Sequence, residues 1–305
     1  MKQTLLIGNG LNLCLDHSIS WGDLLKDIAS DYDVKYNGSI PMPLEFESIV
    51  NQCLSKKSNP SDSIYLEIKE KIVEKISYAK LPLEAIHHEI YNLPIDAIMT
   101  TNYDNLLEYV YNPGYSYKGS KAYKYLFNAT STLHNIFFYH IHGHADSPKT
   151  LCLGYEHYMG VVENMRREIN SKEDRDEDKM KIKEVLFGNS KRRNTWDERF
   201  YTDNIGIIGL GLSESEVDLW WLLAHRAYLY YSNYCNIRKV LKNKITYYDV
   251  LNPNEPEWIE QKKKIHYMLN NSHVEVKKYI IGTDCMDYKD GYRKIMQDIS
   301  NGGLS

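Results

Sequence analysis

The sequence has no strong charge of either sign, no long apolar run and no paired cysteine motif. Its 305 residues carry a formal net charge of −4, which gives no general electrostatic reason to bind nucleic acid. No apolar run reaches the ~18 residues that a membrane-spanning helix needs, so no membrane association is expected. None of the five cysteines forms a Cys-x-x-Cys pair, which makes a zinc ribbon unexpected.

The cysteines are instead scattered along the chain, at Cys14, Cys53, Cys152, Cys235 and Cys285. Isolated thiols, together with an N-terminus that starts with one lysine and a strand rather than a leader peptide, predict a reducing compartment, the cytoplasm. Hydrophobic residues make up 43% of the chain and charged residues 26%, which is typical of a globular protein with a sizeable core.

Short apolar runs closed by glycine or asparagine predict strands that are buried on both faces. Six such runs occur, at 3–9, 96–102, 135–143, 204–211, 245–252 and 274–282. Helical patterns separate them, so we expect an α/β fold, Rossmann-like and doubly wound, with a mainly parallel six-stranded sheet. The chain is expected to be a single domain, with helical insertions at about 25–94 and 155–200.

Within the second insertion, residues 163–195 are dense in charges of both signs. This segment is interpreted as a solvated helix and loop, with a lid or a partner-docking arm as the alternative. The apolar helix predicted at 220–234 is either buried core or a subunit interface.

Ligands of such sheets bind beyond the carboxyl ends of the strands, so the residues that follow each strand are the candidates. The first strand runs into Gly8, Asn9, Gly10 and Asn12. Glycines at this point let a phosphate approach backbone N–H groups at a helix start. The turn has only two of the three glycines of the dinucleotide fingerprint, so on its own it is also compatible with an ordinary turn.

The second strand runs into "TTNYDN", which places Thr101, Asn102 and Asp104 at its end. A carboxamide and a carboxylate two residues apart can bind a polar ligand, although either can also simply cap the next helix.

The third strand ends in "HIHGHAD". His140, His142 and His144 alternate along this strand and so point to one face, where they could bind zinc. The favoured interpretation is a single general base, His142, followed by a glycine that leaves room for substrate, with no metal. His140 and His144 are then structural.

The later strands end in similar polar turns. Gly209, Gly211 and Ser213 follow the fourth strand, Asn252 follows the fifth and Asp284 the sixth. A sheet that serves only as a scaffold has no need of polar residues at nearly every carboxyl end. The convergence therefore predicts a nucleotide site.

The order of these motifs resembles that of the sirtuin superfamily. "LIGNGLN" resembles its opening Gly-Ala-Gly-x-Ser segment, "TTNYDNLLE" its Thr-Gln-Asn-x-Asp motif, and "HIHG" the strand that ends in its catalytic His-Gly. The resemblance spans most of the sheet, at residues 3–15, 96–108, 136–143, 205–220 and 245–285.

Two departures narrow the resemblance. The deacylase branch has a four-cysteine zinc module after the His-Gly strand, whereas this chain has only Cys152 there. The Ala and Ser of the family's opening Gly-Ala-Gly-x-Ser segment are replaced by Asn9 and Asn12. The chain is therefore more similar to the bacterial sirtuin-like proteins of antiphage defence, which consume NAD+. That branch implies an NAD+ glycohydrolase acting in antiviral abortive infection, a homo-oligomer, and often a HerA-type ATPase partner.

The resemblance also implies roles for the residues. His142 acts as the base at the ribose hydroxyls or at water, Asn102 holds the ribose or the attacking water, and Asp104 binds the nicotinamide amide or fixes its loop. Asp218 is expected to orient a helix start. The expected cofactor-binding residues are Gly8, Asn9, Gly10, Asn12, Thr101, Gly209, Gly211, Ser213, Asn252 and Asp284, the last two near the adenosine end.

Three other functions remain open at this stage. The chain could bind NAD+ or a related nucleotide as a sensor subunit without turnover. Nucleic-acid cleavage in a defence complex is disfavoured by the net charge, although the basic runs at 166–167 and 191–193 leave it open. Lysine deacylation is disfavoured by the missing cysteines.

Overall fold

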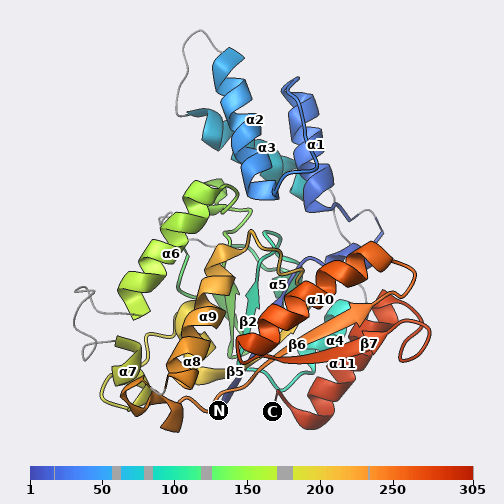
Figure 1. Cartoon of the computed structure of the whole chain (residues 1–305). Coiled ribbons are helices and arrows are strands. Elements are labelled where there is room, and N and C mark those ends of the chain that lie inside the picture. Colours follow the sequence, from blue (N-terminus) through green and yellow to red (C-terminus); the bar gives the residue numbers. More distant parts are fainter. Residues whose placement is uncertain are drawn as a thin grey trace.

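The computed structural model describes residues 1–16, 18–56, 63–78, 85–117, 126–169, 181–232 and 234–304. Its centre is a seven-stranded sheet in the order β3-β4-β2-β1-β5-β6-β7 (Figure 1). All neighbouring strands run parallel except β3, which is antiparallel to β4. The strands are β1 Lys2–Ile7, β2 Ala97–Thr100, β3 Ser131–Leu133, β4 Ile136–His140, β5 Asp203–Ile208, β6 Ile245–Leu251 and β7 Glu275–Ile280. The α/β, Rossmann-like fold class is confirmed.

The six predicted strands are present, and the seventh strand was missed. β3 has three residues and joins β4 through a tight turn in which His134 and Asn135 have positive φ angles of 49° and 67°. A three-residue edge strand is too short to show a period in the sequence. The third predicted run was also too long, because β4 ends at His140 and His142 lies beyond it.

Helices cover both faces of the sheet. Alternate residues of a strand face opposite sides, so Leu6 and Ile207 pack in one core cluster while Leu5 and Ile208 pack in the other. The first cluster is completed by α6 Tyr155–Ile169, α8 Trp196–Thr202, α9 Val217–Tyr231 and α10 Pro256–Asn271. The second is completed by α4 Ala85–Tyr91, α5 Leu106–Tyr111 and α11 Tyr288–Gly302.

Three helices of the first insertion form a unit that we call the helical lobe: α1 Trp21–Asp31, α2 Met42–Lys56 and α3 Ser63–Tyr78. The start of α1 is fixed by Ser20, whose hydroxyl accepts the backbone N–H of Asp23 at 3.1 Å. The lobe has its own apolar core, and Leu151 and Leu153 from the loop after β4 extend into it. The lobe therefore stands over the carboxyl edge of the sheet (Figure 1).

The second insertion contains α6, α7 (Lys181–Leu186) and α8, and residues 170–180 of its charged segment lie outside the described residues. The two arginines of its "KRR" run contact carboxylates of the fold. Arg192 contacts Asp203 at 2.7 Å, and Arg193 contacts both Glu168 and Glu198. Charges paired in this way are not an open basic patch, which weakens the nucleic-acid alternative.

The apolar helix predicted at 220–234 corresponds to α9. Leu222, Leu223 and Leu229 of α9 are buried in the first core cluster, whereas Tyr228 and Tyr231 are more than half exposed. The buried-core interpretation holds for one side of the helix. Among the described residues, no helix has the length and apolar character needed to cross a membrane.

Candidate functional site

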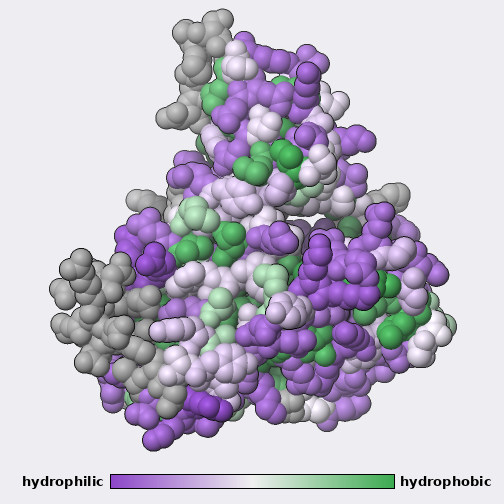
Figure 2. Space-filling view, in the orientation of Figure 1, coloured by the Kyte–Doolittle hydropathy of each residue, from purple (hydrophilic) through white to green (hydrophobic). Residues whose placement is uncertain are grey.

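A cavity of about 870 Å³ lies at the carboxyl ends of the central strands. Its floor comes from the turns after β1, β2, β4 and β5, and its roof from the helical lobe. Trp21, Leu24 and Met42 belong to that roof. Figure 2 shows the surface hollowed between the lobe and the body that carries α10. Ten predicted site residues line the cavity: Asn9, Gly10, Asn12, Thr101, Asn102, Asp104, His142, Gly209, Gly211 and Ser213.

The cavity lies where the strand order reverses, between β1 and β5. There the turn after β1 packs directly on the turn after β5. The backbone N–H groups of Gly8 and Gly10 donate to the carbonyls of Ile208 and Gly209. A Cβ atom on Gly8 would lie 2.5 Å from the Gly209 carbonyl oxygen. Gly8 is therefore required by turn packing, and it does not line the cavity.

The other glycines differ in the space around them. A Cβ atom on Gly10 would meet the Tyr292 hydroxyl at 2.6 Å, and Gly209 has a positive φ of 62°. Around Gly211 nothing lies within 4 Å of such an atom. Gly211 is thus the glycine of the cavity wall with open space beside its backbone.

Asn102 follows β2 and is 7% exposed. Its backbone is held at both ends, because its N–H donates to the Thr100 hydroxyl at 3.0 Å and its carbonyl accepts from His140 Nδ1 at 2.9 Å. Its side-chain amide lines the cavity and makes no hydrogen bond within the described part of the chain. This amide is available to a ligand.

A hydrogen bond between Asn12 and Asp104 joins the turn after β1 to the turn after β2. Asn12 donates its amide N–H to Asp104 at 3.0 Å, and its amide oxygen lies 3.3 Å from His87 Nε2. Asp104 also accepts the backbone N–H of Leu106 at 3.0 Å. Burial raises the pKa of Asp104. Both residues line the cavity, but their polar atoms are engaged with the protein, which favours the loop-fixing role for Asp104.

His142 faces the cavity after β4 and is 3% exposed. Its Nε2 lies 3.0 Å from a carboxylate oxygen of Asp218, which is fully buried in the first turn of α9. Burial alone lowers the pKa of His142, but the negative charge of Asp218, aided by Glu216, outweighs it and the pKa is raised. The ring also packs edge-on against Tyr158.

Asp218 accepts hydrogen bonds, so Nε2 of His142 carries a proton. In the neutral ring Nδ1 then has the free lone pair, and Nδ1 has no hydrogen-bond partner among the residues that the structure describes. A buried carboxylate behind a histidine that presents its other nitrogen to a cavity is the arrangement of a general base. Asp218 was expected only to orient the helix start, and its contact with His142 was not predicted.

Glu216 lines the same wall and was also missed. One of its carboxylate oxygens is buried without a hydrogen-bond partner in the described chain. Burial raises the pKa of Glu216 to about 7, against the lowering influence of His142 and Lys262. The run of acidic residues in "SESEVD" was the available signal for a carboxylate in the site, but the sequence does not reveal which of these acidic side chains faces the cavity.

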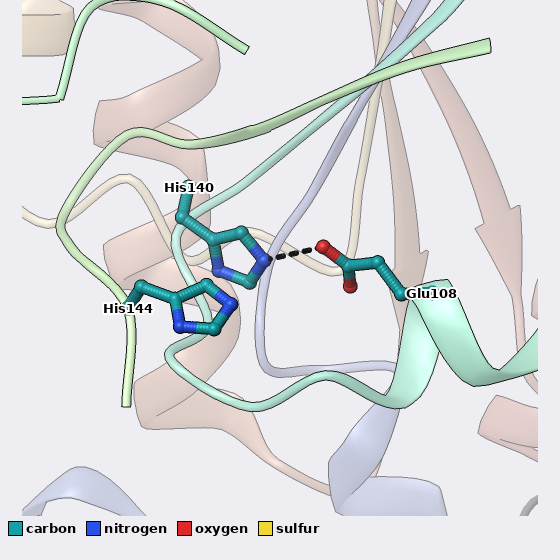
Figure 3. Close-up of side chains that lie close together, drawn as sticks. All are labelled: Glu108, His140 and His144. Carbon is teal, nitrogen blue, oxygen red and sulfur yellow. Dashed lines mark hydrogen bonds and ion pairs between the residues drawn. The ribbon is translucent and has the colours of Figure 1, made fainter. Parts of the chain in front are cut away.

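The three histidines do not share one face, and that expectation is wrong. β4 ends at His140, and the chain turns between His140 and Gly143, whose N–H donates to the His140 carbonyl and whose φ is +104°. Beyond the end of the strand, His142 faces the cavity, whereas His140 and His144 face Glu108 of α5 (Figure 3). His140 Nε2 lies 2.9 Å from Glu108. The imidazole rings of His140 and His144 lie 4.3 Å apart.

Glu108, His140 and His144 place three possible ligand atoms within 4.8 Å of one another. The hydrogen bonds do not suit a metal. Nδ1 of His144 accepts the backbone N–H of Asp146 at 3.1 Å, so its Nε2 carries the proton in the neutral ring. Burial and the nearby His140 lower the pKa of His144 to about 2, which keeps that ring neutral. A protonated nitrogen has no lone pair for a cation.

Asn252 and Asp284 do not line the cavity. Asn252 caps a turn, accepting the Asn254 backbone N–H, and Asp284 accepts the backbone N–H of Ile280. The wall at the end of β6 is instead formed by residues of β6 and α10. There Lys262 lies 3.0 Å from Asp249 and donates to the Tyr247 hydroxyl at 2.6 Å.

Fold and cavity together define a Rossmann-like protein with a cavity at its topological switch point. Residues 96–244 match the family model of the SIR2-like domain, from the residue before β2 to the residue before β6. The match includes Asn102, His142 and Asp218, and it supports the interpretation of the chain as a sirtuin-like protein. No curated protein matches the chain.

Proposed function

We propose that the chain is an NAD+ hydrolase that cleaves NAD+ to nicotinamide and ADP-ribose. A SIR2-like domain is compatible with NAD+-dependent activity. One observation supports hydrolysis in particular: the Asn102 amide and the His142 ring line one cavity, the Asn102 backbone is held by His140, and the His142 ring is held by Asp218. The cavity of about 870 Å³ is also within the ~300–1,000 Å³ range of small-molecule sites.

In the proposed reaction the bond between ribose C1′ and the nicotinamide nitrogen breaks, and its electron pair neutralises the cationic ring. The oxygen of a water molecule bonds to C1′ and transfers its proton to Nδ1 of His142. The carboxylate of Asp218 stabilises the resulting imidazolium through Nε2. The Asn102 amide orients the water or the ribose hydroxyls.

The binding residues are proposed in two groups. The turns after β1 and β5 receive the phosphates and riboses, with Gly211 offering the open backbone. Asn9, Gly10, Thr101 and Ser213 contribute to the same walls. Asn252 and Asp284 are not proposed as contacts, because both lie outside the cavity lining.

The test measures NAD+ loss and the appearance of nicotinamide and ADP-ribose with purified chain. Asn102→Ala and His142→Ala are each expected to lower turnover by at least about 10²-fold with the fold retained. His88→Ala, an exposed histidine of α4, is the matched control and stays active. Full activity of either site variant refutes the assignment. NAD+ binding without loss by wild type would indicate a nucleotide sensor instead.

We further propose that this activity serves antiviral defence in the cytoplasm and is switched on by assembly. The support is the motif order and the absence of the four-cysteine module, which this chain shares with sirtuin-like defence proteins. The proposed partners are further copies of the chain and a HerA-type ATPase. Turnover measured with and without the ATPase tests the pairing, and identical rates at all mixing ratios would contradict it.

A further inference from the structure

The peptide that carries Asn102 is clamped between two strands. Its N–H donates to the Thr100 hydroxyl, which in turn donates to the Ile7 carbonyl of β1 at 2.9 Å. Its carbonyl accepts from His140 Nδ1 at 2.9 Å. The clamp fixes the backbone on both sides of the Asn102 side chain, although that side chain itself has no hydrogen bond within the described residues.

The His140 side of this clamp is held by Glu108. His140 Nε2 lies 2.9 Å from Glu108, and the two side chains are 1% and 0% exposed (Figure 3). A carbonyl oxygen can only accept a hydrogen bond, so Nδ1 must carry a proton for the contact with Asn102 to form. Nε2 facing the carboxylate is also a donor. Burial opposes a charge on this ring, but Glu108 outweighs it and the pKa of His140 is raised.

We propose that His140, held by Glu108, is a positioning residue that aims the Asn102 amide at the reacting ribose. The proposal rests on the proposed NAD+ hydrolysis. Glu108 lies in α5, His140 ends β4 and Asn102 follows β2, so the pair joins three elements around one peptide. A displacement of about 1 Å at such a group can cost about 10²-fold in rate. Neither residue lines the cavity, so both act through Asn102.

Two substitutions of His140 separate this role from a purely structural one. The amide nitrogen of asparagine occupies the place of histidine Nδ1, and that of glutamine the place of Nε2. His140→Asn keeps the donor to the Asn102 carbonyl and leaves Glu108 without its partner. His140→Gln keeps the partner of Glu108 and loses the donor to Asn102.

A positioning role and a purely structural role predict opposite orders of kcat for the two His140 variants. Positioning predicts that His140→Asn keeps kcat within about 3-fold of wild type, whereas His140→Gln lowers kcat by about 10- to 100-fold with an unchanged KM. Stability is expected to run the other way, because a buried carboxylate without a partner is costly. His140→Asn should therefore have the lower Tm. Activity that follows Tm in both variants would overturn the proposal.

A readout without turnover keeps the proposal distinct from the NAD+ hydrolase itself. Hydrogen exchange of peptides covering 100–108 is expected to accelerate in His140→Gln and to stay near wild type in His140→Asn. This comparison holds even if wild type binds NAD+ without cleaving it. Equal protection in both variants overturns the proposal. So does one zinc ion per wild-type chain that both variants lose, because the cluster would then be a metal centre.

Discussion

At the scale of single residues, the polar groups of the cavity divide by whether the protein already uses them. Asn12 and Asp104 bond each other, whereas the Asn102 amide and Nδ1 of His142 have no partner within the described chain. Burying polar atoms without partners is unfavourable unless a ligand or water supplies them. These two groups, together with the buried Glu216 carboxylate oxygen that also lacks a partner in the described chain, are therefore available to a substrate.

Asp218→Asn tests the electrostatics of His142. The Asp218 carboxylate raises the pKa of His142, and the ring acts as a base only above that pKa. Removing the charge lowers the pKa, so the acidic limb of the pH–rate profile is expected to move to lower pH. The maximal rate is expected to fall by about 10²-fold or more, because the imidazolium loses its stabilising partner.

The measurement is kcat/KM for NAD+ between pH 5 and 9, with Asp146→Asn as the control. Asp146 is an exposed aspartate whose side chain lies 3.9 Å from His144, so it removes a carboxylate near a histidine outside the cavity. An acidic limb that stays in place, or moves to higher pH, would contradict the role of Asp218.

At the scale of elements, the helical lobe decides how closed the cavity is. Its core is separate from the two clusters of the sheet, and its Trp21, Leu24 and Met42 line the cavity. The Trp21 ring lies 5.5 Å from the ring of Tyr103, the residue after Asn102. The lobe therefore contacts the loop after β2, which carries Asn102, as well as covering the cavity.

Trp21→Ala is expected to raise the KM for NAD+ by about 3- to 10-fold with a smaller change in kcat. The reason is that an aromatic contact between the Trp21 ring and the bound nucleotide would contribute about 0.5–1.5 kcal/mol. Steady-state kinetics provide the measurement. Tyr267→Ala, an aromatic residue of α10 that is 73% exposed, serves as the comparison and should leave both constants unchanged. A Trp21 variant with wild-type KM would show that the lobe does not contact the bound nucleotide.

At the scale of the whole molecule, the two halves of the sheet meet where the turn after β1 packs on the turn after β5. The site exists because this junction lets the chain leave β1 and β5 in opposite directions. The junction is close-packed, with backbone facing backbone at Gly8 and Gly209. Stability and site geometry are therefore coupled there.

Gly8→Ala is expected to destabilise the fold by roughly 1–3 kcal/mol or more, since the added methyl group would lie 2.5 Å from a carbonyl oxygen that cannot easily move. Thermal unfolding provides the measurement. Gly302→Ala is the control, because nothing lies within 4 Å of a Cβ atom at that position. If both variants unfolded at the wild-type temperature, the junction would not be close-packed.

Much of the architecture could be predicted because parallel strands buried on both faces are continuous apolar runs. Asn102 and His142 could be predicted for the same reason, since each follows such a run. β3 could not, because three residues show no period. Glu108 could not either, because in the sequence it looks like an ordinary polar position in a short helix.

The sequence by itself therefore determined the α/β class, six of the strands and the polar turns at their carboxyl ends, because these depend on local pattern. The tertiary structure alone decided which side chains contact one another. Asp218 contacts His142 across 76 residues, and the turn that ends β4 leaves His142 facing the cavity while His140 and His144 face Glu108. Such pairings depend on the directions in which side chains leave their elements, and residue spacing does not encode those directions.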